Sequence, residues 1–243
     1  MVIIGSNNTS GNAARHLSNS TQALQKSLGR LSSGSKLNNA SDDAAGAAVS
    51  LKLDSQISRL SATRSNVGNA ISLTQTQDGY LKKVGTALER MGELSVLAQD
   101  ETKSNADKAL YSKEYEKLGD FIDDAAGKEF NGVGMFGAAA GIDVTVSENS
   151  GDTAYGMADV DLTSGTYTTA TGAAITDAAT AATAHAAVEA AITQLATDRA
   201  SVGADQSALQ SYSSTLSVLQ DNLGAANSRI KDVDVAEESA NFA

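Results

Sequence analysis

Residues 188–230 read VEAAITQLATDRASVGADQSALQSYSSTLSVLQDNLGAANSRI. Every seventh residue of this stretch is aliphatic: Val188, Leu195, Val202, Leu209, Leu216, Leu223 and Ile230. Such a repeat is typical of a helix that packs along its length against another helix in a left-handed supercoil. The companion positions are mixed, since Ile192 is apolar and the residues that follow it at the same spacing are polar. The stretch predicts a helix over about residues 178–230, with one dry and one partly wet line of contacts.

Two earlier stretches carry related patterns. One seven-residue grid, with Thr74 filling its gap, holds five aliphatic residues: Leu53, Leu60, Val67, Leu81 and Leu88. It predicts a helix over about residues 42–99, roughly 85 Å long at a rise of 1.5 Å per residue. Spacings of three and four residues recur nearer the N-terminus: Ala14, Leu17, Thr21, Leu24, Leu28 and Leu31. They predict a first helix that ends at Gly34, and a further helix is expected over residues 104–126.

The sequence LSSGSKLNNASDDAAGAAVS, between the first two helices, breaks the helical pattern. Gly34 favours the end of a helix, and Asn38 then interrupts the chain. The Ser41 side chain is expected to cap the second helix, with Asp42 and Asp43 in its first turn. A metal or acid–base pair is disfavoured, because neighbouring helical residues point about 100° apart and no histidine is near in sequence. The stretch predicts a helix stop, a hinge and a newly capped helix.

Glycines inside the expected helices admit two interpretations. Six of them are Gly68, Gly79, Gly85, Gly92, Gly203 and Gly224. Each costs up to about 1 kcal/mol relative to alanine when it is exposed. Either the helices approach each other closely at these positions, or the helices are tuned to flex between packing states. The sequence supports both.

The middle of the chain, residues 130–176, has a different pattern. Residues 142–146 alternate apolar and polar side chains as a half-buried strand does, and residues 149–152 supply turn formers. Residues 155–162 are expected to form the return strand and residues 165–169 a third strand. We expect a small β-hairpin appendage that is too short to be an independent domain.

Composition limits the classes of function. The 243 residues contain no cysteine, tryptophan or proline, which suits long uninterrupted helices and repeated unfolding and refolding. The net charge of −11 argues against nucleic-acid binding, which draws on clustered positive charge. The chain has no apolar run long enough to span a membrane. Its first residues also lack the pattern of a cleaved signal peptide, so we expect secretion, if it occurs, to use another route.

A search for catalytic and metal-binding patterns finds none of them. His16 and His185 have no partner at a metal-binding spacing, and both are expected to face solvent. The acidic residues of two clusters are expected to lie on solvated faces: Asp120, Asp123 and Asp124, and Asp152, Asp159 and Asp161. Because no nucleophile–base pair, phosphate loop or dinucleotide motif is present, we expect no enzyme, no cofactor and no metal site.

The expected fold is mainly α, an elongated bundle of long antiparallel coiled-coil-like helices with a small β-hairpin appendage. Its expected parts are a helical segment at residues 1–40, a rod-shaped helical domain at 41–235, and the start of a further segment at 236–243. The seams at the two ends require the head and the tail of the chain to meet. Any apolar stripe left over must be covered by other copies of the chain, as in an assembly subunit.

Four motifs, in the same order, resemble those of bacterial flagellin. They are LSSGSKLNNASDDAAG at residues 31–46, QTQDGYL at 75–81, EFNGV at 129–133 and SRIKDVDVAEE at 228–238. The resemblance implies a secreted structural subunit of the extracellular flagellar filament, in which N- and C-terminal helices pair into an inner tube and a surrounding helical tube. It also implies partners: other flagellin subunits, the flagellar type III apparatus, which exports the unfolded chain, and the filament cap.

The resemblance further implies a surface for a vertebrate Toll-like receptor. The matching residues are Arg90, Glu93, Leu94 and Glu114, while Gly92 replaces an arginine of the family motif. The alternative interpretation is that these residues chiefly pack subunits against one another. The family pattern continues beyond the C-terminal motif with an amphipathic helix, so we expect that this chain does not form filaments alone.

Two other functions remain open from the sequence. A hook–filament junction protein of the same superfamily shares the paired terminal helices. A secreted helical ligand or adhesin would act through the hairpin region, residues 136–170.

Overall fold

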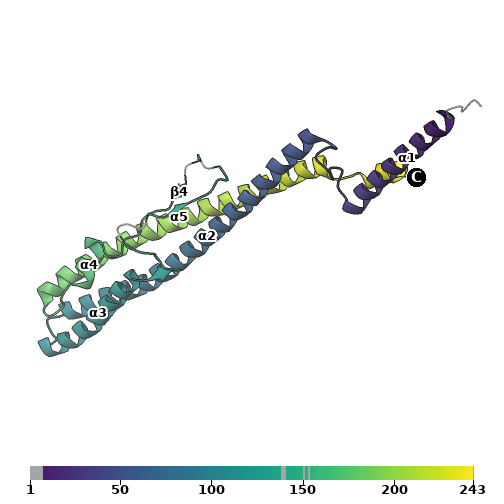
Figure 1. Cartoon of the computed structure of the whole chain (residues 1–243). Coiled ribbons are helices and arrows are strands. Elements are labelled where there is room, and N and C mark those ends of the chain that lie inside the picture. Colours follow the sequence, from purple (N-terminus) through teal and green to yellow (C-terminus); the bar gives the residue numbers. More distant parts are fainter. Residues whose placement is uncertain (1–7, 138–140, 150, 153, 243) are drawn as a thin grey trace, which may run out of the picture. The chain divides into compact units, whose positions relative to one another are not determined.

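The computed structural model describes residues 8–137, 141–149, 151–152 and 154–242 (Figure 1). Its helices are α1 (Asn8–Ser33), α2 (Ala44–Gln99), α3 (Asn105–Ala126), α4 (Gly165–Thr171), α5 (Ala178–Lys231) and α6 (Val235–Phe242). Its strands are β1 (Glu129–Phe130), β2 (Val133–Gly134), β3 (Asp143–Val144) and β4 (Tyr155–Gly156). The prediction of a mainly α fold of long helices with small hairpins is confirmed. Among the described helices, none is long and apolar enough to cross a membrane.

The chain forms two compact units. The terminal unit comprises residues 1–61 and 218–243, and the central unit comprises residues 62–217. Charge is divided unequally between them. The central unit contains 10 Lys and Arg against 21 Asp and Glu, a net charge of −11, whereas the terminal unit contains eight of each. The whole net charge of the protein therefore resides in the central unit. The predicted division at residues 40 and 235 stays a prediction.

In the central unit, α2 and α5 lie antiparallel. Arg199 Nε contacts Asp78 Oδ1 at 2.9 Å, and Gly92 of α2 lies opposite Val188 of α5. The seam residues of both helices within this unit are buried: Val67, Leu81, Leu88, Val188, Leu195, Val202, Leu209 and Leu216. In the terminal unit, Leu60 is buried and three seam residues are half-buried: Leu53, Leu223 and Ile230. A seam of buried aliphatic residues between two long helices is thus part of the core of the central unit.

The third helix begins where the sequence predicts it. Ser104 caps α3, and its side chain and that of Asp107 each accept a hydrogen bond from the other's backbone N–H in a reciprocal capping box. Tyr115 of α3 is fully buried, and its hydroxyl donates to the carbonyl oxygen of Ala170 at 2.7 Å. This contact holds α4 against α3.

The middle segment contains less strand than the sequence predicts. The β1–β2 hairpin turns at Asn131 and Gly132, both with positive φ (52° and 79°), as a type I′ turn requires. The expected return strand is confined to β4, which pairs with β3. The third strand expected at 165–169 is wrong, because this stretch is part of α4. Tyr167 and Ala170, one helical turn apart, are both buried there, a spacing that a strand would not place on one face.

The six glycines named above divide between the two interpretations. A Cβ at Gly85 would lie 3.1 Å from a methyl group of Leu195, and one at Gly92 would lie 3.7 Å from Val188. At the other four, a Cβ would meet nothing within 4 Å: Gly68, Gly79, Gly203 and Gly224. Close helix approach therefore explains Gly85, whereas a Cβ at Gly92 would make an ordinary contact and a Cβ at the other four would meet open space.

Candidate assembly surfaces

The joint between α1 and α2 is tied to the segment between α5 and α6. Gly34 has a φ of +69°, in the left-handed region that favours glycine at the end of a helix. Ser35 and Asp232 form an antiparallel β-bridge, and the backbone N–H of Val233 donates to the carbonyl of Gly34 at 3.1 Å. Segments about 200 residues apart in sequence thus meet through backbone hydrogen bonds in the terminal unit.

Asp43, rather than Ser41, caps α2. Asp43 Oδ1 accepts a hydrogen bond from the backbone N–H of Gly46 at 2.9 Å, directly before the helix begins at Ala44. The prediction that Ser41 is the cap is wrong, because the chain is still in a turn there. Aspartate caps a helix as well as serine does, so the motif retains its predicted role with a different residue.

The other acidic residue of the joint, Asp42, forms an ion pair with α1. Lys26 Nζ lies 2.6 Å from Asp42 Oδ1, and this hydrogen bond lowers the pKa of the Asp42 carboxyl. Because the folded-state pKa is lowered, the contribution to stability is present at neutral pH and is lost as the pH falls through the carboxylate range. Asn38 also faces α1, where its Oδ1 accepts a hydrogen bond from Ser33 Oγ at 2.8 Å. The joint is therefore held by side chains as well as by backbone.

The terminal helices α1 and α6 lie side by side (Figure 1). Glu238 of α6 is 8% exposed and lies 3.5 Å from the Arg30 guanidinium of α1. The apolar stripe of α1 stays largely uncovered, since Leu17 is 71% exposed, Leu24 47% and Leu28 52%. One face of α1 thus packs against other residues of the chain, and another face is exposed to solvent.

A buried polar contact joins α2 and α5 in the terminal unit. Asn227, at one of the polar companion positions, is 8% exposed and accepts a hydrogen bond from Ser50 Oγ at 2.7 Å. Its Nδ2 donates to Asp54 Oδ1 at 2.7 Å. A single buried amide between two helices fixes their register, because a slip along the seam would leave its polar atoms without partners.

Two aspartates of α5 hold the middle segment. Asp205 accepts hydrogen bonds from the Tyr155 hydroxyl and from the backbone N–H of Ala158, both at 2.7 Å. Asp198 accepts a hydrogen bond from the Tyr167 hydroxyl at 2.6 Å. Both carboxylates are buried. Sequence reasoning missed them, although their separation of one heptad placed both on one face of the helix.

The residues of the expected receptor surface do not share one environment. Arg90 lies 2.7 Å from Glu114 and 2.8 Å from Glu93, and all three side chains are exposed. The Glu114 carboxylate raises the pKa of Arg90, and the guanidinium in turn lowers the pKa of Glu114. Leu94 is fully buried. Its assignment as a contact is therefore wrong for the folded subunit, because a leucine on the seam side of α2 packs into the core.

The two histidines differ. His16 is exposed, but His185 is partly buried, with Nδ1 3.1 Å from Ser95 Oγ and Nε2 3.4 Å from Glu189. The expectation of a solvent-facing side chain therefore holds only in part for His185, whose side chain is 35% exposed. Ser95 is fully buried and its hydroxyl donates to the carbonyl of Gly92, so this serine is closed to a substrate.

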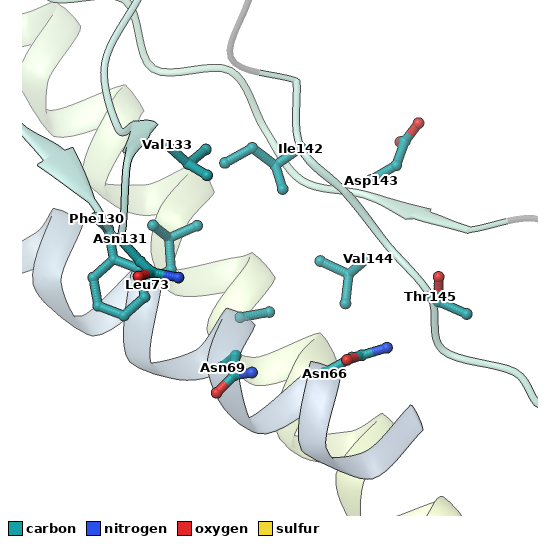
Figure 2. Close-up of a pocket in the computed structure, with 11 residues that line it drawn as sticks. Asn66, Asn69, Leu73, Phe130, Asn131, Val133, Ile142, Asp143, Val144 and Thr145 are labelled. Carbon is teal, nitrogen blue, oxygen red and sulfur yellow. The ribbon is translucent and has the colours of Figure 1, made fainter. Parts of the chain in front are cut away.

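A cavity of about 590 Å³ lies between α2, the β1–β2 hairpin and the stretch around β3 (Figure 2). Its lining combines apolar side chains with three asparagines, one aspartate and one threonine: Ala70, Leu73, Phe130, Val133, Ile142, Val144, Asn66, Asn69, Asn131, Asp143 and Thr145. Asp143 is the one titratable side chain of this lining. In the part of the chain that the structure describes, no three His, Cys, Asp or Glu side chains come together to hold a metal ion.

Comparison with known proteins agrees with this geometry. Residues 4–140 match the bacterial flagellin N-terminal helical region, and residues 185–243 match the bacterial flagellin C-terminal helical region. A flagellin of Halalkalibacterium halodurans is 34% identical over 99% of this chain and 89% of its own length. The flagellar filament 33 kDa core protein of Treponema phagedenis is 32% identical over 99% of this chain and 90% of its own.

Further likenesses point the same way. A flagellin of Bacillus subtilis is 33% identical over 95% of this chain and 87% of its own length. The crystal structure of Bacillus cereus flagellin superposes with a TM-score of 0.55 at 30% identity, over 63% of this chain and 88% of that one. The matched regions include most of α2 and α5, the helices whose seam residues are buried in the central unit. The chain therefore belongs to the bacterial flagellin family and is a structural subunit of the flagellar filament.

Proposed function

We propose that copies of this chain associate through the terminal unit, with the open leucine face of α1 as a principal contact. The observation that carries the proposal is the exposure of Leu17, Leu24 and Leu28 on a helix whose other side is engaged by α6 and Asp42. An apolar stripe of this kind is costly in water and is stabilised when another copy covers it.

Charge supports the same arrangement. The terminal unit has equal numbers of acidic and basic residues, so many copies can gather there without net repulsion. The central units of different copies, each with a net charge of −11, repel one another at a distance and stay solvated. A filament subunit with a neutral terminal unit and an anionic central unit therefore favours contact through its ends.

Replacing Leu24 by Asp should weaken association of the chain with itself by about tenfold or more, since burial of one leucine contributes about 1.5–3 kcal/mol. Sedimentation velocity over a range of protein concentrations measures this. Val133→Asp is the matched control, because Val133 is 49% exposed and Leu24 is 47% exposed. An equal loss in both variants would contradict the proposal, as would a monomer at all concentrations in the unmodified chain.

We further propose export of the unfolded chain by the flagellar apparatus. The absence of cysteine and proline supports this, because neither disulfides nor proline isomerisation can then delay unfolding or refolding. Expressed in a flagellin-deleted Bacillus subtilis strain, the chain should accumulate in the medium, and this accumulation should stop when the flagellar export gate is also deleted. Unchanged secretion in the double mutant would contradict the proposal.

The exposed cluster of Arg90, Glu93 and Glu114 is the part of the expected receptor surface that a partner can reach on the folded subunit. Arg90→Ala should reduce activation of a flagellin-sensing Toll-like receptor in a reporter cell by about tenfold, as truncation of an arginine hot spot does. Lys117→Ala, an exposed lysine on α3, is the control. Equal activation by the Arg90 variant and the unmodified chain would instead favour a purely structural role for the cluster.

A further inference from the structure

Tyrosine is the side chain of this protein that most readily gives up a single electron. The sequence has no cysteine and no tryptophan, and its six tyrosines are Tyr80, Tyr111, Tyr115, Tyr155, Tyr167 and Tyr212. The four methionines react differently, since each takes up an oxygen atom and becomes a sulfoxide. One-electron oxidation of the protein therefore produces a tyrosyl radical, and the surroundings of each tyrosine decide what that radical meets.

Two of these tyrosines, Tyr155 of β4 and Tyr212 of α5, have their rings in contact. The ring centroids lie 5.5 Å apart, and the ring planes are inclined by 59°. Tyr212 is 38% exposed and Tyr155 is half-buried, so an oxidant in solution can reach the pair. Of the aromatic contacts in the described part of the chain, this one joins two tyrosines, whereas the other joins Tyr80 to Phe136.

The Tyr155 hydroxyl donates its hydrogen bond to a buried carboxylate. Its acceptor, Asp205 Oδ1, lies 2.7 Å away, and Asp205 Oδ2 is held by the backbone N–H of Ala158 at 2.7 Å. This hydrogen bond, followed by burial, raises the pKa of Tyr155 to about 12, so the phenol keeps its proton at neutral pH. A phenol loses an electron more easily when a positioned base takes its proton in the same step. Asp205 is placed to be that base.

The other four tyrosines each lack at least one of these features. Tyr115 and Tyr167 are fully buried and closed to an oxidant in solution. The Tyr111 hydroxyl accepts a hydrogen bond from Lys103 Nζ at 3.0 Å, and a cation at this place disfavours the loss of an electron. Tyr80 packs against a phenylalanine, which offers no second phenol. Exposure, a proton acceptor and a second tyrosine ring come together at Tyr155.

We propose that Tyr155 and Tyr212 form an oxidative cross-linking site, at which a haem peroxidase with hydrogen peroxide joins the two rings as dityrosine. Each ring gives up one electron, and the proton of Tyr155 moves to Asp205 while that of Tyr212 moves to water. The two radicals combine in a carbon–carbon bond between the ring positions next to the hydroxyl-bearing carbons. Contact of the rings in the folded chain favours this coupling over a reaction between chains.

The protons and electrons of this step balance. The hydrogens on the two joined carbons leave as protons to water, and each phenolic oxygen regains a proton, that of Tyr155 from Asp205 and that of Tyr212 from water. Hydrogen peroxide takes up the two electrons and two protons and becomes two molecules of water. The product ties the middle segment to α5 by a covalent bond. Because such a bond restricts the unfolded chain, the urea concentration at the midpoint of unfolding should rise.

Peroxidase treatment of the dilute, monomeric chain tests the site. The unmodified protein should gain dityrosine fluorescence, lose the mass of two hydrogen atoms, and give a peptide in which Tyr155 and Tyr212 are joined. Tyr155→Phe and Tyr212→Phe should each lower the yield of this intramolecular product several-fold. Tyr80→Phe is the matched control and should leave the yield unchanged, because Tyr80 is also half-buried in an aromatic pair. Circular dichroism confirms that the helices are retained.

Equal yields in all four proteins would overturn the inference. So would the absence of dityrosine from the unmodified chain, or dityrosine found only between chains or between other tyrosines. Tyr212→Phe keeps the test decisive even where Tyr155→Phe disturbs the middle segment, because it changes an exposed side chain and leaves the hydrogen bond to Asp205 in place. Since the treated chain is monomeric, the result does not depend on the proposed association of copies.

Discussion

Leu209→Ala is expected to lower the free energy of unfolding by about 2–5 kcal/mol, the range observed when a buried leucine is truncated and a cavity is left. Leu209 is fully buried at the α2/α5 seam of the central unit. Two rigid helices flank this position, so the cavity can collapse only in part. Urea unfolding followed by circular dichroism at 222 nm measures the change, with the midpoint and the slope recorded together.

Leu110→Ala is the control for this prediction. Leu110 is 63% exposed on α3, and its truncation should change the free energy of unfolding by less than about 1 kcal/mol. A Leu209 variant as stable as the Leu110 variant would show that the seven-residue repeat does not form the core. Such a result would remove the structural basis for the fold described above.

The second large effect is expected at alkaline pH. The hydrogen bond to Asp205, followed by burial, raises the pKa of Tyr155 to about 12, and burial raises the pKa of Tyr115 to about 12. The unfolded chain loses these protons near pH 10, so between about pH 10 and 12 it binds fewer protons than the folded chain. Stability is therefore fully present below pH 10 and falls as the pH rises toward 12.

Unfolding curves at pH 8, 10 and 11.5 measure this decline. Tyr155→Phe should reduce the decline by about 1–2 kcal/mol, allowing for partial solvent screening at this side chain. Tyr115→Phe should reduce it as well, and a double variant should reduce it further. A decline of the same size in all four proteins would show that these hydroxyls do not stay protonated in the folded state.

The long helices are predictable because the seam repeats over many turns. The predicted helix at 178–230 and α5 at Ala178–Lys231 agree almost residue for residue, and the predicted helix at 104–126 agrees as closely with α3. A seven-residue repeat over fifty residues is compatible with a helix, and no other regular secondary structure would bury the same side chains. The break at Gly34 follows from backbone conformation alone, since its φ of +69° favours glycine.

The middle segment is less predictable because its structure depends on hydrogen bonds with residues that are distant in the sequence. Threonine and tyrosine at 165–169 have strand propensity, yet the stretch is helical. The Tyr167 hydroxyl donates a hydrogen bond to Asp198, and the carbonyl oxygen of Ala170 accepts one from the Tyr115 hydroxyl. These are tertiary contacts that no local pattern encodes. The sequence does not identify Asp43 as the cap either, because three consecutive residues could each cap the helix and only the turn geometry selects one of them.

Pairing of the head and the tail of one polypeptide is the central claim, and a single engineered disulfide tests it. Ser35 and Asp232 face each other in an antiparallel β-bridge, where paired Cα atoms lie about 4.5–5.5 Å apart, so a chain with cysteine at both positions should form an intramolecular disulfide in dilute solution under mild oxidation. Mass spectrometry of the tryptic digest should recover the two peptides joined and the protein still monomeric. Free thiols at both positions, or cross-links that form only between chains, would contradict the account.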